Sequence, residues 1–228
     1  MTAQTQSVSL RNRTVGELAA TMPGATAVFR KHSVDFCCRG DMALGEAARQ
    51  RGVDVDDVER ELRALEASSA ALPESWETGW LIDHILARYH ETHRRELPEL
   101  IELARKVEAV HVDHPQAPRG LAVLLKQMQG ELEVHMKKEE LILFPAMRRR
   151  SGGGLDAPIA QMRHDHAEHG EHLQRMQEIT SGFAQPEGAC RSWQALYFGA
   201  AKLADDLTKH IHLENNVLFP RYQESGTA

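Results

Sequence analysis

The sequence predicts an all-α protein, an antiparallel up-down four-helix bundle preceded by a small helical N-terminal domain. Three observations predict this class. Apolar residues recur at helical spacing along four long segments, strand-like alternation is almost absent, and breaks rich in Gly or Pro separate the segments. With 42% hydrophobic residues, the 228-residue chain has enough apolar side chains to fill the core of such a bundle.

Residues 1–67 predict the small N-terminal domain. Short helices are expected over four stretches, TVGELAATM, GATAVFRKH, ALGEAARQRG and DVDDVERELRALEA. Asp54 opens the last stretch and is a residue type that caps helix N-termini. Residues 68–79, SSAALPESWETG, are small, polar and Pro-bearing, and therefore predict a linker.

Residues 80–228 predict the bundle. Its four helical segments run roughly over 78–111, 119–150, 156–182 and 188–223, with the first one beginning in the linker. Segments of about 30 residues would form helices about 45 Å long. The breaks between them, DHPQAPRG, SGGGLDAP and FAQPEG, are short, which favours antiparallel neighbours.

The composition restricts the class of partner. The chain has 27 basic and 33 acidic side chains and a formal charge of −6, which argues against a nucleic-acid partner. No apolar run reaches the ~18 residues of a membrane span, and the first residues lack the apolar core of a secretory signal. Three cysteines cannot form a disulfide framework. We therefore expect a soluble, cytoplasmic protein without membrane or nucleic-acid partners.

One phrase occurs twice in the chain. GELEVHMKKEELILFP, residues 130–145, returns 75 residues later as DDLTKHIHLENNVLFP, residues 205–220. Side chains four apart on a helix share a face, so His135 and Glu139 point the same way, as do His210 and Glu214. A single His/Glu pair is an ordinary feature of a wet helix face, but two matched copies predict two halves of one metal site.

Acids extend both copies of the phrase. Glu131 and Asp206 stand one turn before the two histidines and are candidates for supporting the ligands or carrying protons. Glu140 is rotated off the ligand face and is a weaker candidate.

Further imidazoles are available on the first and third long helices. Of the 13 histidines, 12 lie at or after His84. The first helix carries His90 and His93, and the third carries His164, His166, His169 and His172. An offset of 76 residues relates His90 to His166 and His93 to His169, which predicts a duplicated helical hairpin with one or two imidazoles from each of these helices at its centre. Nitrogen and carboxylate donors suit iron, manganese or zinc; because no H-E-x-x-H motif occurs, iron is the first choice.

These residues resemble the hemerythrin-like RIC proteins, the di-iron family for repair of iron centres. The resemblance covers nearly the whole chain and rests on VFRKHSVDFCCRG, RYHETHRRELPELI, HMKKEELILFP and HIHLENNVLFPR. It implies that the metal ligands are His90, His135, Glu139, His166, His210 and Glu214. It places the third-helix ligand on His166 because that histidine directly follows an acid, Asp165, which joins Glu131 and Asp206 as a supporting acid.

The resemblance also implies a cofactor and a role. The cofactor would be two iron ions in an oxo- and carboxylate-bridged centre, with Glu139 and Glu214 as bridges. The role would be the restoration of iron–sulfur clusters damaged by nitric oxide or oxidants, by holding or delivering iron. Iron–sulfur proteins would be the clients, and nitric oxide or oxygen potential ligands.

Cys37 and Cys38 form a separate feature of the N-terminal domain. Adjacent cysteines can form only a strained disulfide, so a structural bridge is not expected. They are candidates for redox thiols, for transient iron ligands or for an interaction loop, and Arg39 beside them would be expected to lower a thiol pKa.

Other functions use the same residues. A hemerythrin-like carrier or sensor would bind oxygen or nitric oxide reversibly, and a di-iron enzyme would reduce nitric oxide or peroxide with an external electron donor. A helical interaction module would carry its histidines incidentally. Whether the protein is an enzyme is left open by the sequence.

Overall fold

The computed structural model describes residues 9–22, 24–66, 77–149 and 154–223. Throughout these residues the regular structure is helical, and a single β-bridge joins Thr14 to Ala43. Contacts divide the chain into two compact units, one built on the short helices before residue 67 and one on the long helices after residue 76. Residues 68–76 of the predicted linker lie outside the described residues.

The N-terminal unit is a cluster of short helices. They are η1 (Leu10–Asn12), α1 (Val15–Thr21), α2 (Ala25–Lys31), α3 (Leu44–Arg51) and α4 (Val55–Glu66). The Thr14 side chain caps α1, and Asp54 caps α4 as predicted, its Oδ1 accepting the backbone N–H of Asp56 at 2.8 Å. Phe29 and Phe36 pack in the core with ring centroids 5.7 Å apart.

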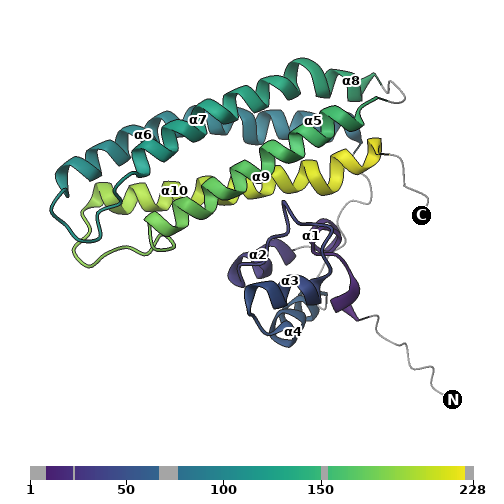
Figure 1. Cartoon of the computed structure of the whole chain (residues 1–228), viewed down its shortest axis with the longest axis horizontal. Coiled ribbons are helices and arrows are strands. Elements are labelled where there is room, and N and C mark those ends of the chain that lie inside the picture. Colours follow the sequence, from purple (N-terminus) through teal and green to yellow (C-terminus); the bar gives the residue numbers. More distant parts are fainter. Residues whose placement is uncertain (1–8, 23, 67–76, 150–153, 224–228) are drawn as a thin grey trace. The chain divides into compact units, whose positions relative to one another are not determined.

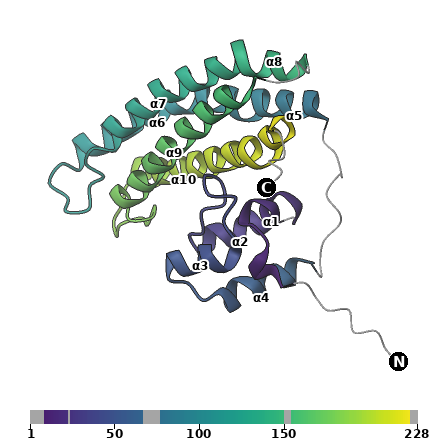
Figure 2. The ribbon, with the colours of Figure 1, turned by 45° about the vertical axis from the view of Figure 1, so that its right-hand side comes forward.

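The second unit is an antiparallel up-down four-helix bundle, as the sequence predicts (Figure 1). Its first long helix consists of α5 (Thr78–Ile85), η2 (Leu86–His90) and α6 (Glu91–Val110), and its second of α7 (Leu121–Lys138), η3 (Glu139–Leu143) and α8 (Phe144–Arg148). The third is α9 (Asp156–Ile179), and the fourth consists of α10 (Arg191–Leu213), η4 (Glu214–Leu218) and η5 (Phe219–Tyr222). Figure 2 shows from a second side that α7 runs alongside both α6 and α9.

Apolar side chains from all four long helices fill the interior of the bundle. The fully buried ones include Leu81, Ile85, Leu121, Leu125, Met128, Leu132, Ile159, Met176, Leu196 and Leu207. Burying one such side chain contributes about 1.5–3 kcal/mol, so this core holds the helices in place even where polar residues interrupt it. No helix of the described residues is long and apolar enough to span a membrane.

Three turns of the bundle are π-helical, which the sequence did not indicate. η2 ends at His90, η3 begins at Glu139 and η4 begins at Glu214. A π turn holds one residue more than an α turn and is found mostly at functional sites. The two copies of the repeated phrase therefore share a backbone irregularity as well as a sequence, and both place it at the glutamate.

Candidate metal centre

The structure brings the six predicted ligand side chains together between the long helices. The first ligand group is His90, His210, Glu139 and Glu214, and the second ligand group is His135, His166 and the same two glutamates. Within each group the candidate ligand atoms lie within 4.8 Å of one another. All six side chains are buried, with at most 2% of their surface exposed.

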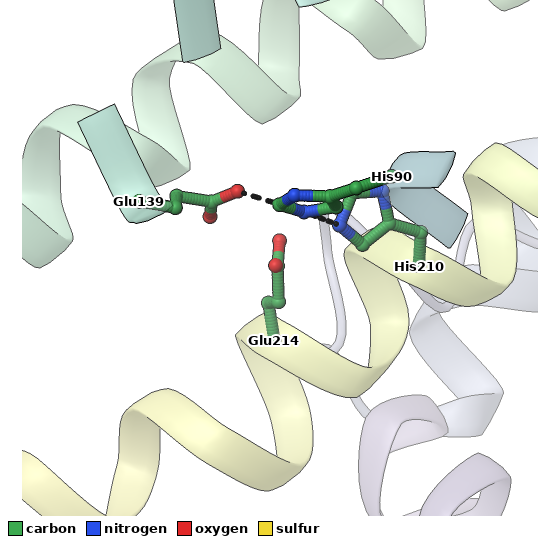
Figure 3. Close-up of side chains that lie close together, drawn as sticks. All are labelled: His90, Glu139, His210 and Glu214. Atoms are coloured by element: carbon green, nitrogen blue, oxygen red, sulfur yellow. Dashed lines mark hydrogen bonds and ion pairs between the residues drawn. The ribbon is translucent and has the colours of Figure 1, made fainter. Parts of the chain in front are cut away.

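The first ligand group joins the first and fourth long helices (Figure 3). His90 Nε2 lies 3.2 Å from His210 Nε2 and 3.4 Å from Glu139 Oε2. Figure 3 shows that the carboxylates of Glu139 and Glu214 both point toward this pair of imidazoles. The nitrogens are spaced as two ligands of one ion would be, since metal–nitrogen bonds are about 2.0–2.1 Å long.

The second ligand group joins the second and third long helices. His135 Nε2 lies 3.1 Å from His166 Nε2 and 3.4 Å from Glu139 Oε2. The same oxygen of Glu139 is therefore equally far from a histidine of each group. This carboxylate stands between the two groups, as a bridging ligand would.

The charge of this region favours a cation. Glu139 and Glu214 are fully buried, and moving a carboxylate out of water costs several kcal/mol unless an opposite charge compensates it. The neighbouring donors are imidazoles, which are neutral when they act as ligands. Four nitrogens with two shared carboxylates form a donor set that suits iron, manganese or zinc, so the residues fit the metal that the sequence predicts.

Of the three supporting acids predicted from the sequence, Asp165 contacts a ligand histidine. Its Oδ2 lies 3.2 Å from His135 Nδ1, and its carboxylate also accepts from Lys138 and Gln161 at 2.8 Å. Burial alone would raise the pKa of Asp165, but these hydrogen bonds hold it well below its usual value. Asp165 is thus a charged acceptor that directs His135 Nε2 toward the centre.

The other two supporting acids face different partners. Asp206 accepts from Arg88 and Lys202, and Glu131 Oε2 lies 3.2 Å from His172 Nδ1.

Glu140 supports a ligand although its spacing made it a weaker candidate. Its Oε1 lies 2.8 Å from His90 Nδ1 and accepts from Arg94 at 2.7 Å. Burial raises the pKa of Glu140, but the hydrogen bonds from Arg94 and His90 outweigh this and hold it below its usual value. The α7 face next to Glu139 is turned toward α6, and this packing could not be read from spacing within one helix.

His93 and His169 also lie beside the centre. Both rings are buried, and neither ring nitrogen has a hydrogen-bond partner among the described residues. The His93 ring lies 5.5 Å from that of His210, and the His169 ring lies 5.2 Å from that of His135. Burial, followed by the neighbouring histidines, lowers the pKa of His169 to about 3, so its ring is neutral at pH 7.

The cysteine pair lies in the N-terminal unit beside Asp35. The Cys37 and Cys38 thiols are free and 3.5 Å apart, and both backbone N–H groups donate to Asp35 Oδ1. The hydrogen bond from Cys38, burial and the Asp35 charge raise the pKa of Cys37 well above its usual value. The expectation that Arg39 lowers a thiol pKa is therefore wrong for Cys37, and Arg39 donates to Gln50 at 2.9 Å.

Known proteins resemble both parts of the chain. Residues 81–222 match the hemerythrin HHE cation binding domain, and residues 11–66 match a domain of unknown function, DUF542. The chain is 45% identical over 217 residues to the "Iron-sulfur cluster repair protein YtfE" of Cronobacter sakazakii, covering 94% of this chain and 97% of that protein. Proteins of the same name from Citrobacter koseri and Escherichia coli O1:K1 are each 44% identical, with 94% of this chain and 98% of each relative covered. The chain therefore belongs to the hemerythrin HHE family and, with these relatives, to the family of YtfE iron–sulfur cluster repair proteins.

Proposed function

We propose that this chain binds two iron ions between its long helices and takes part in the repair of damaged iron–sulfur clusters by holding or delivering that iron. One observation carries the proposal: two histidine pairs share two fully buried glutamates. A buried donor set of this kind is stable only with cations between its members. The names of the relatives supply the link to cluster repair.

Each ion would have its own imidazoles. His90 and His210 would hold one ion, His135 and His166 the other, and Glu139 and Glu214 would bridge the two. Bound iron would supply a redox-active metal that can exchange with the surroundings.

The outer nitrogens support this assignment. Glu140 accepts at His90 Nδ1 and Asp165 at His135 Nδ1, which fixes the proton on the outer nitrogen and leaves Nε2 to face the centre. A carboxylate acceptor also makes the imidazole a stronger ligand. These contacts prepare the histidines for an ion without any change of the fold.

The setting of the activity is part of the same proposal. Iron–sulfur proteins would be the clients, nitric oxide or oxygen the small molecules that reach the iron, and the cytoplasm the location. Cys37 and Cys38 would act in the N-terminal unit, by contact with a client or by thiol chemistry.

The first test is the metal content of the full chain, purified anaerobically without chelators and supplied with iron. We expect about two iron ions per chain by elemental analysis, because the donors form two groups. Replacing Glu139 and Glu214 together by Ala should remove most of this iron. A matched double variant, Glu168→Ala with Glu171→Ala, changes two exposed glutamates of α9 and should keep it. Little or no iron in the unmodified chain would overturn the proposal.

The second test is repair. A purified iron–sulfur enzyme inactivated by nitric oxide should recover activity with the iron-loaded chain but not with the Glu139/Glu214 variant. Reversible gas binding without recovery would instead identify a carrier or sensor. Sustained consumption of nitric oxide with an electron donor would identify an enzyme.

A further inference from the structure

A third cluster of metal-ligating side chains lies in the bundle, outside the two ligand groups. Glu131 of α7 and His169 and His172 of α9 bring one candidate ligand atom each to within 4.8 Å of one another. None of these three residues is needed by the proposed iron centre. His169 packs against the His135 ring, so the cluster is a direct neighbour of the second ligand group.

The polar atoms of this cluster are buried without hydrogen-bond partners among the described residues. This holds for both ring nitrogens of His169, for His172 Nδ1 and for Glu131 Oε2. His172 Nδ1 and Glu131 Oε2 are 3.2 Å apart, but their orientation is not that of a hydrogen bond. Unsatisfied buried polar atoms are costly, and several of them facing one point indicate a shared ligand.

The other half of the duplicated bundle shows what such a position holds. The 75-residue repeat pairs Glu131 with Asp206 and Gln127 with Lys202, and the 76-residue offset pairs His172 with Glu96. The Lys202 ammonium lies 2.9 Å from Asp206 Oδ2 and 2.7 Å from Glu96 Oε2. A positive charge therefore occupies this position in one half of the bundle.

The half with Glu131 has no such side chain. Gln127 replaces the lysine and donates to Glu131 Oε1 at 2.9 Å, and neither Glu131 nor His172 pairs with a lysine or arginine in the described part of the chain. At the position of Glu96, the chain has an imidazole, a ligand for transition metals rather than for an ammonium group. The replacement converts an ammonium site into a set of metal ligands.

We propose that Glu131, His169 and His172 bind one divalent transition-metal ion, as a third metal site separate from the two iron positions. Two imidazoles and one carboxylate are a ligand set of zinc and of iron(II), with further positions taken by water. Glu131 is 39% exposed and His172 17% exposed, so an ion can reach the site from solvent while His169 anchors it from the interior.

The test uses Zn²⁺ as the probe on the full chain. The protein is loaded with iron(II) anaerobically, desalted and dialysed against buffered Zn²⁺, and both metals are counted per chain. The unmodified chain should take up about one zinc ion more than the His169→Leu/His172→Leu variant, with equal iron in both. Because the readout is this difference in zinc, it does not depend on how much iron the centre holds.

Two further variants make the result specific. Gln127→Lys places an ammonium where the other half has Lys202, at an exposed position that tolerates the change, and should also abolish the extra zinc. His164→Leu removes an exposed histidine of α9 and should leave it unchanged. The proposal is overturned if the unmodified chain binds no extra zinc, if the zinc enters by displacing iron, or if the His169/His172 and Gln127 variants retain it.

Discussion

The two ligand groups have the same ligands but different surroundings. Beyond the first group, Asp206 is 2% exposed and is bound by Arg88 and Lys202. Beyond the second group, the counterpart Glu131 is 39% exposed and has only Gln127 and His172 as partners among the described residues. Duplication therefore preserved the ligands, while the outer charges differ between the halves.

Burial explains this difference. Ligands at the centre must match in both halves, because each ion needs the same kinds of donor. Outer acids answer only to their local surroundings, and a buried carboxylate requires a cation whereas a half-exposed one is stabilised by water. Asp206 and Glu131 represent these two cases at equivalent positions.

The largest expected effect comes from neutralising the two outer acids. Asp206→Asn should lower the free energy of unfolding of the metal-free chain by about 2–3 kcal/mol, because Arg88 and Lys202 lose a buried partner. Glu131→Gln should cost less than about 1 kcal/mol. Denaturant unfolding of both variants measures the difference, and equal losses would contradict the comparison.

The pH dependence sharpens this prediction. Burial would raise the pKa of Asp206, but the hydrogen bonds from Arg88 and Lys202 hold it below its usual value. A carboxylate with a lowered pKa in the folded state stabilises the fold above its unfolded pKa, and loses this contribution as pH falls through its folded pKa. The deficit of Asp206→Asn should therefore be large at pH 7 and shrink toward about pH 2. A deficit that stayed constant would show that packing, not charge, is responsible.

The next effect concerns the acids that contact the ligand histidines. Glu140→Gln and Asp165→Asn should each weaken binding of one metal ion by about tenfold, ~1.4 kcal/mol, because an amide keeps an acceptor oxygen but removes the charge. Competition with a chelator measures the affinity. Glu133→Gln is the control, since Glu133 also binds Arg94 and no contact links it to a ligand histidine. Equal weakening by the control would assign the effect to Arg94 instead.

Much of the fold could be predicted because helical periodicity and Gly/Pro breaks are local signals. The four long helices lie close to the predicted ranges, and Asp54 caps α4 as its type suggests. The pairing of His135 with Glu139 followed from the pitch of a helix and a repeat. These features depend on residues near each other in the sequence.

Features that depend on packing between helices could not be predicted. Glu140 reaches His90 because α7 lies beside α6, which no spacing within α7 reveals. His169 and His172 were set aside in favour of His166, although the structure shows them beside Glu131. The π turns at Glu139 and Glu214 also have no signature in the local sequence, since they respond to what the glutamates must reach.

The smallest expected effect would make the halves more alike. In the metal-free chain, Gln127→Lys should raise the free energy of unfolding by a few tenths of a kcal/mol, because the new ammonium lies one turn from Glu131 on an exposed face. Gln127→Met is the matched control, since it has similar length and no charge, and it should give no such gain. High salt should remove the gain, as expected for an exposed ion pair. If lysine stabilises the chain no more than methionine does, then Glu131 and His172 do not form the negatively charged counterpart of the site that holds Lys202.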